Sequence, residues 1–506
     1  MRIYIVVFLV FGLSRFSLPA QPYYVALNGS DLNPGTLAAP FRTLNKAIGL
    51  VQPGETIFLR GGIYTLSASV IIASSGKPDA MISLHAYPGE RPVLDGFGMP
   101  LSASYRGFRL KGSYWHVKGL DIRGAGHNGM LIEGGHHNLI EQCAFYRNRD
   151  SGLQLSAGAS HNTIINCDSY LNADPPDYGD ADGFAPKLDV GSENYFYGCR
   201  AWKNSDDGWD GYLRGANNVN NRIENCWSFE NGYLEDGTDP GPQANGNGFK
   251  MGGSDDRSLN HTFTLQHCLA FKNKVKGFDQ NNNKGSMFLY NCTGYNNKGP
   301  NFQLNQEVEP GMEIVVKNCI DLAGSPKIAT FAEQARNSWM PPLAAKPLDF
   351  LSLDDSTAYG PRKADGSLPD IPFMHLGPNS GLINAGIDVG LPFNGPAPDL
   401  GCFETNITSA SGYLFLTHFI LSPNPLRSAG ELGFQLDQSA HCQIQLFDSA
   451  GRLAQTLADR EFKAGEQHLP ISPTGLPPGV YYLKIQCSRR GKITAQAMKA
   501  VVILPD

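Results

Sequence analysis

An acidic stretch in the middle of the chain gathers three carboxylates around a Gly-Trp pair. In NSDDGWDGYLRG, residues 204–215, Asp206, Asp207 and Asp210 fall within five positions. Because like charges this close repel one another, the stretch is either a solvated acidic turn or a cage of oxygen ligands for a cation such as Ca²⁺. The spacing is not that of an EF-hand loop, and no His/Cys cluster points to zinc. Taken alone, the stretch favours the solvated turn.

The spacing of the cysteines indicates the secondary structure around this stretch. Seven of the ten cysteines stand in one recurring frame, with an apolar residue three places before, an aromatic residue three places after in six frames, and Asn five places after in the same six. The seven are Cys143, Cys167, Cys199, Cys226, Cys268, Cys292 and Cys319. Cys143 and Cys167 are 24 residues apart. A fixed register of this kind indicates a solenoid of short strands.

Within each frame the apolar residue and the cysteine differ in parity, so one uninterrupted strand cannot bury both. A bend is expected at the polar residue just before each cysteine, often Asn, which tolerates left-handed geometry. The pattern predicts an all-β fold, a right-handed parallel β-helix, in which these cysteines stack as small buried side chains rather than form disulfides. Cys442 and Cys487 lie elsewhere, and the sequence leaves open whether they pair.

A solenoid needs capped ends, because an open coil exposes strand edges and apolar core. Near the N-terminus Leu44, Ala47, Ile48 and Val51 recur at helical spacing before the stop signal of residues 53–54, Pro-Gly. We therefore expect one short amphipathic helix to cap this end.

The frame also aligns the acidic stretch with its neighbours. Each coil carries a Gly after the recurring Asn, and in two coils that Gly is delayed by inserts that would wall a cleft on one face. Alignment on this Gly places Asp182 one coil before Asp206, Asp207 and Asp210, and Lys250 one coil after them. Neighbouring coils lie about 4.8 Å apart. The alignment predicts a Ca²⁺ site of four aspartates beside Lys250, a base whose pKa burial and a divalent cation would lower.

Four segments of this face resemble family 9 polysaccharide lyases, which are pectate lyases with a parallel β-helix fold. The segments are DGFAPKL, NSDDGWDGY, GNGFKMGG and GFDQNNN. The opening YYVALNGSDLNPG and the closing PAPDLGCFE are also similar to that family, so the resemblance covers residues 23 to 405.

The resemblance implies a secreted, Ca²⁺-dependent pectate lyase that cleaves 4-linked galacturonan (polygalacturonate, pectin) by β-elimination. It implies that Asp182, Asp206, Asp207 and Asp210 hold the Ca²⁺, which neutralises the uronate carboxylate. It implies that Lys250 is the Brønsted base that abstracts the C5 proton.

Several alternatives stay open. Lys187 and Arg214 are candidate substrate-carboxylate binders near the same face, or ordinary surface cations. The substrate could be another uronic acid polymer. A β-helix glycoside hydrolase of the polygalacturonase type could use paired aspartates, although Lys250 would then lack a role. A non-catalytic carbohydrate-binding surface protein is a third interpretation.

The ends of the chain differ in character from the solenoid. Residues 1–20 read as a secretory signal peptide, followed by the β-helix lyase domain over 21–405, a linker over 406–417 and a small C-terminal β-sandwich over 418–506. The segments SPNP and GVYYLKI resemble the C-terminal sorting domains of type IX secretion cargo, which implies export to the cell surface or beyond by that machinery. A carbohydrate-binding module is the competing interpretation.

The net charge of -6 offers no basic face, so no nucleic-acid partner is expected. We expect the mature protein to be a soluble, exported monomer.

Overall fold

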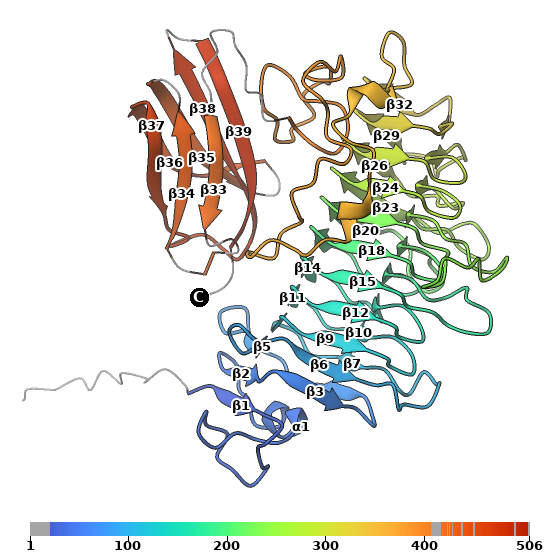
Figure 1. Cartoon of the computed structure of the whole chain (residues 1–506), viewed down its shortest axis with the longest axis vertical. Helices are drawn as coiled ribbons and strands as arrows, with labels where there is room; N and C mark the ends of the chain where they lie inside the picture. Colours follow the sequence, from blue (N-terminus) through green and yellow to red (C-terminus); the bar gives the residue numbers. More distant parts are fainter. Residues whose placement is uncertain are drawn as a thin grey trace, which may run out of the picture.

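The computed structural model describes residues 21–405 and 416–503, apart from short gaps at 423, 425, 428, 437–438, 449–450 and 490–491. The predicted signal peptide and all but the last two residues of the predicted linker lie outside these ranges. Three long parallel sheets form a β-helix whose coils stack along the long axis of the molecule (Figure 1). Each regular coil contributes one strand to each sheet, so the predicted solenoid is confirmed.

We call the 12-stranded sheet A, and name the two 10-stranded sheets B and C. Sheet A consists of β1 (Tyr23–Val25), β2 (Thr56–Leu59), β5 (Ile82–Ala86), β8 (Trp115–Lys118), β11 (Leu139–Glu141), β14 (Thr163–Ile165), β17 (Asn194–Tyr197), β20 (Val219–Glu224), β23 (His261–Gln266), β26 (Met287–Tyr290), β29 (Ile314–Lys317) and β32 (Glu333–Ala335). Sheet B consists of β3 (Gly62–Thr65), β6 (Pro92–Asp95), β9 (Asp121–Arg123), β12 (Ala144–Tyr146), β15 (Asp168–Tyr170), β18 (Arg200–Trp202), β21 (Trp227–Phe229), β24 (Leu269–Phe271), β27 (Thr293–Tyr295) and β30 (Ile320–Leu322). Sheet C consists of β4 (Val70–Ile72), β7 (Phe108–Leu110), β10 (Met130–Glu133), β13 (Leu153–Ser156), β16 (Phe184–Pro186), β19 (Trp209–Asp210), β22 (Phe249–Lys250), β25 (Phe278–Asp279), β28 (Phe302–Leu304) and β31 (Lys327–Ile328).

The bend between sheets A and B falls at the residue before each recurring cysteine, as predicted. These residues all have positive φ and are Gln142, Asn166, Gly198, Asn225, His267, Asn291 and Asn318. A second left-handed residue, which the sequence analysis did not predict, follows each strand of sheet B from β9 to β30. Examples are Arg147, Leu171 and Lys203. Two such residues per coil turn the chain sharply without glycine at every corner.

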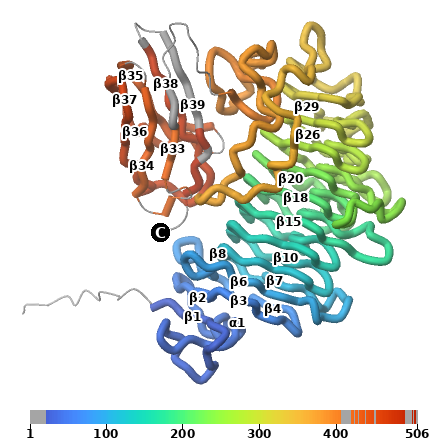
Figure 2. Tube along the Cα trace, viewed as in Figure 1, coloured from blue at the N-terminus to red at the C-terminus, as the bar shows by residue number. Residues whose placement is uncertain are grey.

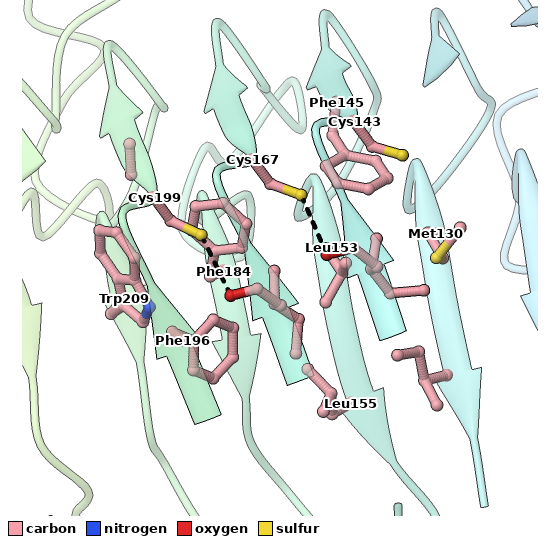
Figure 3. Close-up of a cluster of buried hydrophobic side chains, with 14 of the residues drawn as sticks. Met130, Cys143, Phe145, Leu153, Leu155, Cys167, Phe184, Phe196, Cys199 and Trp209 are labelled. Carbon is pink, nitrogen blue, oxygen red and sulfur yellow. Dashed lines mark hydrogen bonds between the residues drawn. The ribbon is translucent and has the colours of Figure 1, made fainter. Parts of the chain in front are cut away.

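The seven recurring cysteines are free thiols buried in the core, which confirms the predicted stack. Each Sγ lies just inside the bend and faces the coil before it. The Sγ of Cys167 lies 3.6 Å from the carbonyl oxygen of Ile140, and the Sγ of Cys199 lies 3.5 Å from that of Ile164 (Figure 3). Aromatic side chains such as Phe184 fill the space beside the thiols. The thiols therefore act as small apolar side chains in the core.

The predicted N-terminal cap is a single turn of helix, α1 (Leu44–Ile48). The hydroxyl of Thr43 accepts a hydrogen bond from the backbone N–H of Lys46 and caps its N-terminus. Leu44 and Ala47 are buried against the first coils, as expected. The helix is shorter than the apolar spacing indicated, because it ends at Gly49 and Val51 packs into the core from the following loop.

Residues 340–405 return along the outside of sheet B and carry two short 3-10 helices, η1 (Pro347–Asp349) and η2 (Ser356–Tyr359). An ion pair between Arg362 and Asp168, 2.7 Å apart, pins this segment to the coils. A second apolar cluster, which includes Phe373 and Phe271, fills the space beneath it.

The C-terminal region forms two antiparallel sheets that share an apolar core, as predicted. One sheet holds β33 (Leu416–Ser422), β34 (Gly430–Leu436) and β37 (Gly465–Ile471). The other holds β36 (Leu453–Phe462), β35 (Ala440–Asp448), β38 (Gly479–Arg489) and β39 (Lys492–Ile503). Cys442 and Cys487 form a disulfide between β35 and β38, which answers the question that the sequence left open.

The C-terminal domain lies beside sheet A, whereas the long loops of the green coils extend on the side away from it (Figure 2). Val502 packs against Leu139 and Ile165 of sheet A, and the hydroxyl of Tyr482 lies 3.3 Å from a carboxylate oxygen of Glu224. Among the described residues, no helix is long and apolar enough to span a membrane.

Candidate active site

The predicted chemical residues meet on sheet C, where β16, β19 and β22 lie side by side. Asp210 in β19 pairs with Lys250 in β22, which pairs in turn with Asp279 in β25. The backbone N–H of Gly183 donates to the carbonyl oxygen of Asp207, and this bond places Asp182 directly beside Asp207. The structure therefore has the column alignment that the sequence predicts.

The glycine after each of these aspartates lets the neighbouring coils approach closely. A Cβ at Gly208 would lie 1.9 Å from the hydroxyl of Ser228 and 2.7 Å from the carbonyl oxygen of Gly248. A Cβ at Gly183 would lie 2.6 Å from the side chain of Ala201. Because no other residue fits, these glycines hold the preceding aspartates in the turn at the edge of sheet C.

The recurring asparagines fix the chain just before the acidic residues. The side-chain N–H of Asn172 donates to the amide oxygen of Asn204 at 2.8 Å, and that of Asn204 donates to Asn231 at 2.9 Å. All three side chains are fully buried. The sequence analysis expected turn residues here, and the structure shows an asparagine ladder that continues from coil to coil.

Three aspartates form a compact cluster, which we call the aspartate triad: Asp182, Asp207 and Asp210. Their ligand oxygens all lie within 4.8 Å of one another, and all three residues are buried. Asp206 is also buried and is not one of these three; its Oδ1 accepts a hydrogen bond of 2.6 Å from the backbone N–H of Asn245. The fold thus brings together three of the four predicted Ca²⁺ ligands.

Two lysines lie against the triad. The Nζ of Lys250 is 3.1 Å from Asp207 Oδ2 and 3.3 Å from Asp210 Oδ1. The Nζ of Lys187 is 2.6 Å from Asp182 Oδ2 and 3.5 Å from Asp210 Oδ2. Lys187 is therefore not a surface cation, since its ammonium group already faces two carboxylates in the interior.

Burial and crowding act together on the carboxylates. Burial raises the pKa of Asp182 well above its usual range, against the pull of Lys187, and Asp210 raises it further. Burial and the neighbouring Asp207 do the same for Asp206. The pKa of Asp210 is lowered instead, because the attraction of Lys250 and Lys187 outweighs burial.

The predicted lowering of the Lys250 pKa does not occur in this structure. Burial acts in the predicted direction, but the attraction of Asp207 and Asp210 outweighs it and raises the pKa of Lys250 well above its usual value. The prediction assumed a divalent cation beside the lysine, and without one the carboxylates favour the ammonium form.

Arg214 lies at the exposed rim of this site. Its guanidinium is 3.2 Å from Asp255, and about two thirds of each of these two side chains is exposed. The hydroxyl of Tyr212 donates to Asp255 at 2.7 Å, and the Tyr212 ring lies 5.5 Å from the Nζ of Lys250. Sequence reasoning missed Tyr212 and Asp255. Tyr212 lies within the quoted NSDDGWDGY motif, whereas no pattern pointed to Asp255.

The triad fits a hard divalent cation. It offers carboxylate oxygens only, and Ca²⁺ prefers six to eight oxygen ligands, some of them water. Asp207 Oδ2 is buried and faces the Lys250 ammonium group at 3.1 Å, and a carboxylate oxygen with one such partner keeps a lone pair for a cation. The residues present therefore suit Ca²⁺ by number, charge and chemistry.

Comparisons with known proteins point to one family. Residues 23–318 match the family model described as a Pel9A-like, right-handed β-helix region. Pectate lyase L of Dickeya dadantii (strain 3937) is 41% identical over 398 residues, which cover 76% of this chain and 90% of that protein. Pectate lyase PEL9 of Emericella nidulans is 32% identical over 386 residues, covering 70% and 92%.

Solved structures agree with these relatives. The crystal structure of pectate lyase Pel9A is 39% identical in sequence with a TM-score of 0.71, and the match covers 77% of this chain and 97% of that one. A structure named rhamnogalacturonan lyase is 28% identical with a TM-score of 0.62, covering 71% and 97%.

Proposed function

This chain is a polysaccharide lyase of the Pel9A-like right-handed β-helix family, and we propose that it cleaves 4-linked galacturonan by Ca²⁺-dependent β-elimination. One observation carries the proposal: a lysine, Lys250, lies against two members of a buried aspartate triad, at the edge of an exposed rim. The identity of 41% to a protein named pectate lyase L supports galacturonan as the substrate.

Asp182, Asp207 and Asp210 would hold the Ca²⁺, and Asp206 adds negative charge beside Asp207. When bound, the cation supplies positive charge that neutralises the aspartates and the substrate carboxylate and so acidifies the C5 proton. The buried position of the triad strengthens this electrostatic effect, because the surrounding dielectric is low.

Lys250 is the proposed base. A divalent cation on the triad would lower the pKa of Lys250, and the Nζ in its neutral form would accept the C5 proton. The C5–H electron pair forms the C4–C5 double bond, the C4–O bond breaks, and the departing glycosidic oxygen takes up a proton from solvent. Asp207 and Asp210 hold the Nζ in place through contacts of 3.1 and 3.3 Å. No water molecule is added across the broken bond, so the product carries a conjugated double bond.

Arg214 is the proposed contact for a substrate carboxylate, since its guanidinium is exposed and guanidinium groups bind carboxylates in a bidentate manner. Tyr212 lies between Arg214 and Lys250, 5.7 Å and 5.5 Å from their cationic groups. Its ring could stack against a sugar ring in the same subsite.

An assay on polygalacturonate with and without Ca²⁺ tests the proposal. We expect the ultraviolet absorbance of an unsaturated product to rise only with Ca²⁺ present, and Lys250→Ala to abolish the rise. Reducing ends that form without this absorbance would mean hydrolysis and would falsify the proposal.

A second candidate substrate is rhamnogalacturonan, because the rhamnogalacturonan lyase structure shares the fold at 28% identity. A panel of uronic acid polymers, assayed by the same absorbance, distinguishes the two. Faster turnover of polygalacturonate supports the first substrate.

Export completes the proposal. A signal peptide over 1–20, a soluble monomeric lyase domain and a C-terminal domain read by type IX secretion machinery would deliver the enzyme to polymer outside the cell. Mass spectrometry of protein recovered from the medium tests the signal peptide: we expect an N-terminus at Gln21. Retention of a mutant that lacks residues 418–506 would support the sorting role.

A further inference from the structure

We propose that Lys187 is the built-in counter-charge of the aspartate triad: it stabilises the site when no cation is bound and lowers its affinity for a divalent cation. This inference rests on the proposed Ca²⁺ site. It replaces the expectation that Lys187 binds substrate with a positioning role inside the protein.

The contacts of Lys187 all point inward. Its Nζ lies 2.6 Å from Asp182 Oδ2, 3.5 Å from Asp210 Oδ2 and 3.2 Å from the carbonyl oxygen of Asp180. An ammonium group has three N–H donors, so these three oxygens can use all of them. Lys187 thus joins the loop that ends at Asp182 to the strand that carries Asp210.

The exposure of the two candidate substrate contacts differs sharply. The Lys187 side chain is 7% exposed, whereas that of Arg214 is 63% exposed. A polymer passing over the rim can reach the Arg214 guanidinium, but it cannot reach an ammonium group that is buried and already paired. Substrate binding by Lys187 would require the Asp182 contact to break.

The charge balance gives the functional consequence. When ionised, the triad carries three negative charges and Lys187 and Lys250 carry two positive charges, so these five side chains sum to one negative charge. Asp206, beside Asp207, adds another carboxylate. A buried carboxylate without a partner is strongly destabilising, which explains the need for Lys187 before a cation binds. The same positive charge, only a few ångströms from the triad, repels a divalent cation.

The test is Lys187→Met in the full chain, with Ca²⁺ binding measured by calorimetry and thermal unfolding measured in EDTA and in excess Ca²⁺. Methionine keeps the bulk and removes the charge. We expect the Ca²⁺ dissociation constant to fall about tenfold or more, because one repelling charge is lost. We expect a lower Tm in EDTA and a smaller deficit in Ca²⁺.

Lys274→Met is the matched control. Lys274 is a partly buried lysine that anchors an inserted loop, since its Nζ contacts Asp239 and the carbonyl oxygens of Gly241 and Ala244. None of these ion-pair and hydrogen-bond partners of Lys274 belongs to the triad. Its loss should lower the Tm in both buffers and leave the Ca²⁺ dissociation constant within twofold. Lys187→Arg, which keeps the charge, should stay closer to the wild-type dissociation constant than Lys187→Met.

An unchanged or larger dissociation constant in Lys187→Met would overturn the inference, and so would a raised KM with unchanged Ca²⁺ binding, which would mark a substrate contact. If Lys187→Met folds only with Ca²⁺, as a strong stabilising role predicts, its affinity is measured by competition with a chelator. Absence of Ca²⁺ binding by the wild type would remove the proposed metal site as well. If the wild type binds Ca²⁺ and Lys187→Met does not bind it more tightly, only the proposed role of Lys187 is wrong.

Discussion

The asparagine ladder and the aspartate triad occupy neighbouring positions on the same coils, equally buried but opposite in character. In the ladder, each amide donates to the next and accepts from the one before, as Asn204 does between Asn172 and Asn231. Repetition therefore satisfies every neutral side chain. In the triad, repetition stacks like charges, and burial together with Asp210 and Asp207 raises the pKa of Asp182. Stacked amides satisfy one another's hydrogen bonds, whereas stacked carboxylates need positively charged groups from other parts of the site.

This difference separates structure from function within one coil. The ladder needs no ligand, because its hydrogen bonds stabilise the folded chain whether or not a cation is bound. In the part of the chain that the structure describes, the triad forms ion pairs with Lys187 and Lys250 alone, and it remains suited to a further cation. The same coil register can thus carry both a structural seam and a reactive site.

The largest expected effect comes from Lys250→Ala. Removing a general base costs about 10² to 10⁴ in kcat, so we expect at least about a hundredfold loss on polygalacturonate. Lys272→Ala is the control, since Lys272 pairs with Asp355 at 2.7 Å outside sheet C. It should retain wild-type turnover. Activity of Lys250→Ala within tenfold of the wild type would show that Lys250 is not the base.

Removal of Ca²⁺ tests the role of the aspartate triad directly. EDTA should abolish activity, and added Ca²⁺ should restore it. A ligand present at 100 times its dissociation constant stabilises a protein by about 2.7 kcal/mol, so the Tm should also rise with Ca²⁺. Full activity in EDTA, in protein shown to be metal-free, would remove the cation from the mechanism.

Asn273→Ala interrupts the asparagine ladder. The amide of Asn273 donates to the carbonyl oxygen of Ser228 and to Asn297, each at 2.9 Å, and accepts from Asn231. Its loss leaves buried groups without partners and should destabilise the fold by about 1–3 kcal/mol. Urea unfolding measures the change, and Ca²⁺ affinity should stay within twofold. A change in Ca²⁺ affinity as large as that in stability would mean that ladder and triad are coupled.

The smallest effect concerns a buried carboxylate that has permanent partners. Glu141 on sheet A lies 2.7 Å from both His116 and Lys118, and the pKa of Glu141 is lowered to about 2 because these contacts outweigh burial. Burial lowers the pKa of His116 to about 4. Both shifts favour the folded state at neutral pH, and the His116 contribution is lost as the pH falls from 6.5 toward 4.

Between pH 6.5 and 5.5 the unfolded chain takes up the proton that folded His116 refuses. This difference should lower the free energy of unfolding by about 1 kcal/mol relative to His116→Gln over the same interval. Urea unfolding at the two pH values measures it. An equal pH dependence in wild type and His116→Gln would contradict the lowered pKa of His116.

The sequence by itself determined the solenoid, its register and the columns of the site, because a fixed frame around cysteine repeats in seven successive coils, with asparagine five places later in six of them. It also indicated the N-terminal helix and the C-terminal sandwich from their periodicities. The residues alone left a hydrolase and a non-catalytic surface protein open, and membership of a lyase family excludes both.

The tertiary structure alone decided how the charges are partnered. Sequence spacing placed Lys187 and Arg214 on one face, but only the fold buries the first against Asp182 and exposes the second. It also gathered three of the four aspartates into the triad, joined Cys442 to Cys487, and placed Asp207 and Asp210 against the Lys250 ammonium group. The physical reason is that register sets which backbone positions are neighbours, whereas pairing and burial depend on where each side chain ends in three dimensions.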